Sequence, residues 1–257
     1  MKFIRLRRIA LSLGLLLALP RAVPAADLAV AAAANLVYAL DALNAEFVRS
    51  HPEVHLTKTT GASGSLVAQI TNGAPYDVFL SADLEFAQKL VQAGGASASS
   101  LKTFALGRLV IWSTQPGIDV TTVDGLIVNP AVHKLAIANP QTAPYGRAAM
   151  EAIAKLRLGP AAEPKLVQGE NISQAAEFVE TGNADAGFVA MSLVLSPKLK
   201  TRGRWTEVPA GLYSPLGQAA VITRHGEGNP AAQAYLDFLS SPAAGAILEQ
   251  FGYRLPR

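Results

Sequence analysis

Two segments in the N-terminal part of the chain each run from an extended apolar stretch into a small polar residue and then into a helical pattern. In the first, residues 28–34 lead to Asn35, after which apolar residues recur at helical spacing. In the second, residues 54–59 lead through a glycine-containing turn to Ser63, and residues 66–73 resemble a short helix ended by glycine. The carboxyl ends of parallel strands share one edge of an open sheet. We therefore expect Asn35 and Ser63 to face one ligand.

Asparagine and serine are both common N-cap residues, so the sequence predicts that Asn35 and Ser63 each cap the helix that follows. A helix N-terminus leaves several N–H groups unpaired and carries partial positive charge, and it therefore attracts anions. One such junction alone is also consistent with an ordinary capped helix in a βα unit. Two of them at one sheet edge favour an anion-binding site.

Strand and helix patterns alternate along the rest of the chain, which has 257 residues and is 50% hydrophobic. This alternation predicts an α/β fold whose sheets are mostly parallel and flanked by helices. The pattern restarts near residue 135, which indicates two lobes joined by two crossings, with the ligand in the cleft between them. The expected strands lie at 78–82, 109–112, 135–138, 187–190 and 219–222, and the expected later helices at 146–158, 172–180, 230–238 and 242–251.

Residues 1–25 are expected to be a secretory signal peptide. Basic residues precede an apolar run at 9–19 that is too short to span a bilayer comfortably, and small residues follow up to Ala26. The alternative is a retained membrane anchor. Cleavage after Ala25 or Ala26 would remove five of the 22 basic residues and leave 17 against 19 acidic ones, a net charge of −2. The mature chain then has no basic surplus, so we expect no nucleic-acid partner.

Cysteine is absent from the sequence. This excludes disulfides, thiolate metal sites and the lipidated cysteine that tethers some exported proteins. An exported and untethered protein without cysteine suits the periplasm, which we predict as its location.

No motif in the chain is typical of a catalytic or metal site. His51 and His55 are four residues apart, but Pro52 prevents the helix that would bring both side chains to one metal ion. There is no Gly-x-Ser-x-Gly motif, and no histidine shares a segment with an acid in a way that indicates a triad. We therefore expect a protein that is not an enzyme and has no cofactor.

The candidate cleft is instead rich in small neutral donors. Its four segments, at 34–35, 62–64, 143–146 and 171–172, contain no Lys, Arg, Asp or Glu. Each charge-assisted hydrogen bond contributes about 1.5–3 kcal/mol, so amides, hydroxyls and helix N-termini can together offset the desolvation of a dianion. A protonated oxyanion needs an acceptor for its proton, so the absence of a carboxylate favours a fully deprotonated one.

These segments resemble those of the periplasmic molybdate-binding proteins of ABC transporters. The resemblance runs from about Ala26 to the C-terminus, and its matching stretches are 31–36, 61–66, 73–83, 139–146 and 169–172. It implies a type II two-lobed periplasmic binding protein whose ligand is molybdate or tungstate and whose partner is the membrane permease of an ABC importer. We expect a monomer, with lobe 1 at 26–113 plus 216–257 and lobe 2 at 114–215.

The same resemblance implies which residues contact the oxyanion. The chain departs from one branch of the family, which has serine at the position of Asn35 and tyrosine at that of Ala190; the tyrosine here is Tyr145, as in another branch. The implied ligand-binding residues are Ala34, Asn35, Ser63, Tyr145 and Ile172.

Other interpretations of the same segments remain open. Binding proteins for sulfate and ferric iron share the Ser-Gly turn and the Asp-Val-Phe strand. A ferric site would need paired tyrosines and an acid; Tyr145 and Tyr213 are candidates, but no adjacent tyrosine pair exists. A periplasmic enzyme on the same scaffold and a ligand-free interaction module are the remaining alternatives.

Overall fold

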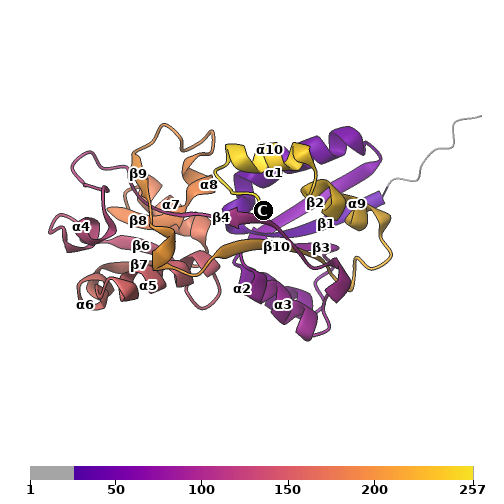
Figure 1. Ribbon diagram of the computed structural model, residues 1–257, viewed down its shortest axis with the longest axis horizontal. Helices are drawn as coiled ribbons and strands as arrows, with labels where there is room; N and C mark the ends of the chain where they lie inside the picture. The colour runs from indigo at the N-terminus through magenta and orange to yellow at the C-terminus, as the bar shows by residue number, and fades with distance from the viewer. Residues whose placement is uncertain (1–25, 257) are drawn as a thin grey trace, which may run out of the picture.

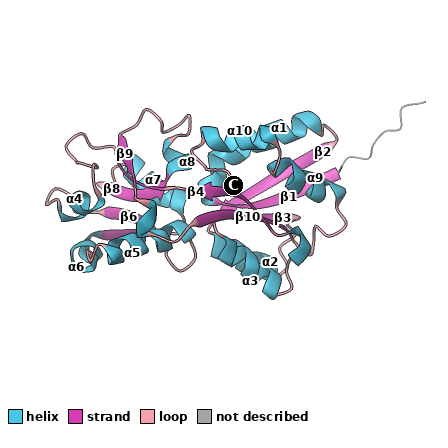
Figure 2. Ribbon diagram, viewed as in Figure 1, coloured by secondary structure: helices cyan, strands magenta, loops and turns pink. Residues whose placement is uncertain are grey.

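The computed structural model describes residues 26–256, which form two lobes, each built on a five-stranded sheet (Figure 1). Both sheets are flanked by helices, as the alternating sequence pattern predicts (Figure 2). The expected signal peptide, residues 1–25, lies outside the described residues. Within residues 26–256, no helix combines the length and the apolar character needed to cross a membrane.

The first sheet has the strand order β2-β1-β3-β10-β4. Strand β1 runs parallel to β2 and β3, whereas β10 is antiparallel to β3 and β4. Alternate residues of β1 face opposite layers: Leu28 and Val30 pack with α1, α9 and α10, and Ala31 packs with α2 and α3. The elements are β1 (Ala26–Ala33), β2 (Val54–Gly61), β3 (Val78–Ser81), β4 (Lys102–Gly107), β10 (Leu216–Ile222), α1 (Val37–Ser50), α2 (Ser63–Thr71), α3 (Leu84–Gln92), α9 (Pro230–Leu239) and α10 (Pro242–Gln250).

The second sheet has the order β7-β6-β8-β5-β9. Strand β6 is parallel to β7 and β8, and β5 is antiparallel to β8 and β9. Three strands of this sheet, β5, β6 and β8, are almost wholly apolar, as expected for strands covered on both faces. The elements are β5 (Leu109–Ser113), β6 (Leu135–Ala138), β7 (Leu166–Gly169), β8 (Ala186–Ala190), β9 (Arg204–Glu207), α4 (Val123–Val128), α5 (Pro144–Lys155), α6 (Gly159–Ala162), α7 (Ile172–Glu180) and α8 (Met191–Val194).

The two-lobed α/β architecture confirms the predicted fold class, but the sheets are mixed and not mostly parallel, because β10 and β5 run antiparallel to their neighbours. The position of the first crossing also differs from the expected boundary after residue 113. Strand β5 pairs with β8 and β9 and so belongs to the second sheet. An apolar run identifies a strand without identifying its partners, which is why the sequence placed 109–113 with lobe 1. We propose that the chain crosses at Arg108, between β4 and β5, and returns between β9 and β10.

Gly107, the last residue of β4, lies where the chain leaves the first sheet. A Cβ atom at this position would overlap the hydroxyl of Tyr145 and come within 2.8 Å of Nε2 of Gln218. Both neighbours are buried side chains. The close approach of these two polar groups therefore requires glycine.

We expect Gly107→Ala to lower the free energy of unfolding by about 1–3 kcal/mol, because overpacking displaces buried side chains. Urea unfolding followed by circular dichroism measures this change. Gly217→Ala is the matched control on the facing strand, since its Cβ would meet only Thr103 Cγ2 at an ordinary 3.6 Å. Equal stability of the two variants would contradict the close approach at Gly107.

Candidate functional site

A small cavity lies between the lobes, where the turns after β1, β2 and β3 meet the N-termini of α5 and α7. All five residues predicted to contact a ligand line it: Ala34, Asn35, Ser63, Tyr145 and Ile172. The other lining residues are Ala33, Gly61, Ala62, Ala82, Ala143, Pro144 and Asn171.

The cavity has no charged lining. None of the twelve residues that line it is Lys, Arg, His, Asp or Glu, and Tyr145 is their only ionisable side chain. Nor do residues 26–256 hold any cluster of three or more His, Asp or Glu side chains arranged for a metal ion. A ligand in the cavity would therefore be held by neutral groups.

Three helices begin at the cavity, and each brings a backbone amide to it. Ser63 is the first residue of α2, Ile172 is the first of α7, and Tyr145 follows Pro144 at the start of α5. The helices have 9, 9 and 12 residues, respectively. Their N-terminal partial charges are positive and converge on the cavity from both lobes.

The neighbouring amides of these helices already have acceptors. The N–H of Gly64 donates to the carbonyl of Thr142 at 2.8 Å. The side chain of Asn171 caps α7 and accepts from the amides of the second and third helical residues. Among the described residues, no acceptor is found for the amides of Ser63, Tyr145 and Ile172. These three donors are available to an anion.

Ser63 does not act as the predicted N-cap. The capping position is Ala62, which makes no side-chain cap bond, because β2 extends to Gly61 and the helix begins one residue earlier than expected. The Oγ of Ser63 instead accepts a hydrogen bond from the N–H of Ala82 at 3.0 Å. Since this bond uses a lone pair, the hydroxyl proton of Ser63 remains free to donate into the cavity.

Asn35 is also not the predicted N-cap. It lies inside a 3₁₀ turn, Ala34–Leu36, and α1 is capped at Leu36 without a side-chain bond. This extra turn directs the amide of Asn35 toward the first sheet, where Nδ2 donates to Oε1 of Gln218 at 2.7 Å and to the hydroxyl of Tyr253 at 2.8 Å. Its Oδ1 is buried and has no partner among the described residues.

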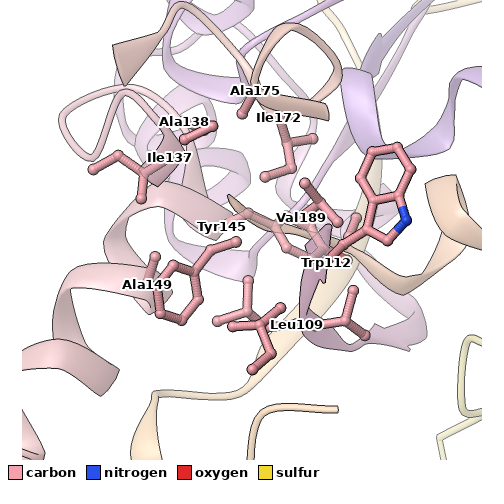
Figure 3. Close-up of a cluster of buried hydrophobic side chains, with 14 of the residues drawn as sticks. Leu109, Trp112, Ile137, Ala138, Tyr145, Ala149, Ile172, Ala175 and Val189 are labelled. Atoms are coloured by element: carbon pink, nitrogen blue, oxygen red, sulfur yellow. The ribbon is translucent and has the colours of Figure 1, made fainter. Parts of the chain in front are cut away.

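Tyr145 is buried in the second-lobe core with Leu109, Ala149 and Ile172 (Figure 3). Its hydroxyl lies against Gly107 and has no hydrogen-bond partner among the described residues. Burial, followed by the neighbouring Tyr253 and Tyr213, raises the pKa of Tyr145 well above its usual value. The hydroxyl therefore stays protonated at neutral pH and is an unused donor among the described residues.

The two lobes are in contact around the cavity, so the cleft is closed. Ser173 Oγ donates to the carbonyl of Ala34 at 2.8 Å, and Ser192 Oγ donates to the carbonyl of Asn35 at 2.7 Å. On the α3 side, Arg147 of α5 forms ion pairs with Asp83 and Glu85 of the first lobe. Because these carboxylates pair with Arg147, its positive charge does not make the cleft cationic.

Sequence reasoning missed Ala82, which lines the cavity, and three residues behind the lining, namely Ser192, Gln218 and Tyr253. Gln218 did carry a signal, since it is a polar residue inside the apolar strand pattern of β10. The others are brought to the site only by the tertiary fold. Tyr213, considered for a ferric site, does not line the cavity; its hydroxyl accepts from the N–H of Leu109 at 3.2 Å.

Comparison with known proteins relates the chain to transport proteins. Residues 28–254 match the family described as bacterial extracellular solute-binding protein. The molybdate-binding protein ModA of Azotobacter vinelandii is 43% identical over 247 residues, which cover 96% of each chain. ModA of Rhodobacter capsulatus is 43% identical over 95% of this chain and 94% of its own. The solved structure of the A. vinelandii periplasmic molybdate-binding protein superposes with a TM-score of 0.84 at 35% identity, covering 90% of this chain and all of that one.

Proposed function

We propose, since this chain belongs to the bacterial extracellular solute-binding proteins and to their molybdate-binding group, that it captures molybdate and tungstate and delivers them to an ABC importer. It is a binding protein and not an enzyme, in keeping with the names of its family and of its relatives. The periplasm is the location that fits relatives described as periplasmic. We further propose that the protein acts as a monomer that meets the importer's permease at the membrane.

The observation that carries this proposal is the interlobe cavity lined by neutral donors. The amides of Ser63, Tyr145 and Ile172 and the hydroxyls of Ser63 and Tyr145 offer five donors that the described protein leaves unused. At about 1.5–3 kcal/mol for each charge-assisted bond, these donors and the three helix N-termini can offset the desolvation of a tetrahedral dianion.

The lining also favours an anion that carries no proton. Among the described residues, its unpartnered side-chain oxygens are Oδ1 of Asn35 and the hydroxyl of Tyr145, and both belong to neutral groups. A monoprotonated oxyanion such as phosphate would place its O–H among donors, where it finds no carboxylate to accept it. Molybdate and tungstate present only oxygen acceptors to the donors of the cavity. We propose that the residues around them are Ala34, Asn35, Ser63, Tyr145 and Ile172.

Thermal unfolding in the presence of different anions tests this function. Molybdate and tungstate should raise the melting temperature, and at one hundred times the dissociation constant the gain in stability is about 2.7 kcal/mol. Phosphate and ferric citrate should leave the melting temperature unchanged. Sulfate, which has the same charge and shape with shorter bonds, is the control for cavity size. If phosphate stabilised the protein as much as molybdate does, Oδ1 of Asn35 would accept a ligand proton and the proposal would fail.

A further inference from the structure

Gln218 is a fully buried polar side chain that lies behind the cavity without lining it. It belongs to β10, the strand that follows the return crossing between the lobes. The pairing of β10 with β4 shifts register between Gln218 and Ala219, so the backbone of the strand is irregular at this residue. A buried amide in an apolar strand is costly unless all of its polar atoms are paired.

The hydrogen bonds of Gln218 fix the orientation of its amide. Nε2 donates to the carbonyls of Ala82 and Leu216, both at 2.9 Å. Since carbonyl oxygens only accept, the amide nitrogen must face them, and Oε1 must face the other way. There Oε1 accepts from Nδ2 of Asn35 at 2.7 Å.

Two cavity residues are linked to this amide. Asn35 is linked directly, and the bond from its Nδ2 leaves its Oδ1 as the unpartnered atom. Ser63 is linked through Ala82: the carbonyl of Ala82 accepts from Gln218, and its N–H donates to Oγ of Ser63. The bond from Ala82 occupies a lone pair of Ser63 and leaves its hydroxyl proton for the cavity.

We infer that Gln218 is the positioning residue of the anion site. Its amide donates to Ala82 and accepts from Asn35, and these two bonds hold the cavity groups of the first lobe in their binding arrangement. This inference deepens the proposed function and rests on it. An apolar residue of similar size would fill the same space in the sheet but would leave Nδ2 of Asn35 and the carbonyl of Ala82 without these partners.

The variant Gln218→Glu tests the inference through pH. Protonated glutamic acid reproduces both functions, because its O–H donates to a carbonyl and its C=O accepts from Asn35. Ionised glutamate has only acceptors, so one of its oxygens would repel the carbonyl oxygens of Ala82 and Leu216. Its negative charge would also repel the anionic ligand. Burial raises the pKa of such a carboxyl group, so we expect it to ionise, and tungstate binding to weaken, within a neutral pH range.

Tungstate affinity of Gln218→Glu, measured by calorimetric titration, should fall about ten- to a hundredfold between pH 6 and pH 9. Wild-type affinity should change less than about twofold, since burial raises the pKa of the nearby Tyr145 and Tyr253. The charged groups on adjoining elements are Asp83, next to Ala82, and Arg108, next to Gly107. Both are present in the wild type, which therefore controls for their titration.

Two further variants complete the test. Asn44→Asp places an acid at another buried amide, where Oδ1 accepts from the hydroxyl of Tyr235 at 2.6 Å away from the cavity. Its tungstate affinity should not depend on pH, although its stability should. Gln218→Met keeps the length of the side chain without its polarity, and should bind about tenfold or more weakly at every pH.

The outcomes separate the inference from the function on which it rests. Failure of the wild type to bind tungstate or molybdate would overturn the proposed function. Wild-type binding together with a pH-independent, unweakened Gln218→Glu protein would overturn the positioning role. If Gln218→Glu does not fold at pH 9, unchanged affinity of folded Gln218→Met would overturn the same role.

Discussion

The Ser63→Asp protein should lose molybdate binding by about a thousandfold or more, the largest effect that we expect from any single change at the site. Ser63 is buried and lines the cavity, and its hydroxyl proton is free to donate because its oxygen accepts from Ala82. A carboxylate in this position would face a dianion in a closed cleft, and such like-charge contact costs several kcal/mol. Each 1.4 kcal/mol raises the dissociation constant about tenfold. Calorimetric titration measures the loss.

The folded state should tolerate this substitution. Ser63 is the first residue of α2, and an acidic side chain in a first helical turn interacts favourably with the helix dipole. The N–H of Ala82 would donate to the new carboxylate as it does to Oγ. Ser63→Asn is the matched control, since it has nearly the same shape as aspartate without the charge. Nearly normal binding by folded Ser63→Asp would remove Ser63 from the site.

The sequence predicted the site's location better than its hydrogen bonds. Apolar and extended runs identified most strands, and the rule that strand ends share an edge brought Asn35 and Ser63 to one cavity. Their assignment as N-caps was wrong, because each helix starts one residue away from its expected position. A shift of this size is ordinary for a boundary, but it changes which group a side chain meets.

The elements around the crossing were the least predictable. Strands β4 and β9 and helix α4 were not expected, and β5 was placed in the wrong sheet. Four of the eight strand pairings are antiparallel and involve β10 or β5, the strands that follow the two crossings. The hydrophobic pattern indicates which residues are buried, whereas the direction and the partners of a strand depend on where the chain re-enters the sheet. For the same reason the roles of Gln218 and Tyr253 could be found only in the structure.

The neutrality of the cavity depends on how nearby charges are arranged. Arg147 lies two residues after Tyr145 in α5, yet it pairs with Asp83 and Glu85 across the cleft. The side chain of Asp83 is only 3% exposed and also accepts from the amide of Phe86 at the start of α3. The charged groups thus satisfy one another outside the lining, and backbone amides are left as the principal recognition groups.

Deleting one of these amides should therefore weaken binding strongly without disturbing the helix. Ile172→Pro removes the N–H of the first residue of α7, a position at which proline is favoured. The preceding Asn171 has φ −143° and ψ 176°, an extended conformation that a residue before proline adopts readily. We expect molybdate affinity to fall by about 1.5–3 kcal/mol, or roughly ten- to a hundredfold.

The matched control for this deletion is Ile172→Ala, which shortens the buried side chain and keeps the amide. Both variants lose core packing around Ile172 and should unfold more easily than the wild type. Only Ile172→Pro loses the donor, so the ratio of the two dissociation constants isolates the contribution of the N–H group. Calorimetric titration of both proteins below their melting temperatures gives this ratio. Equal constants would mean that the amide of Ile172 does not bind the anion and that α7 contributes to the cavity only through its shape and dipole.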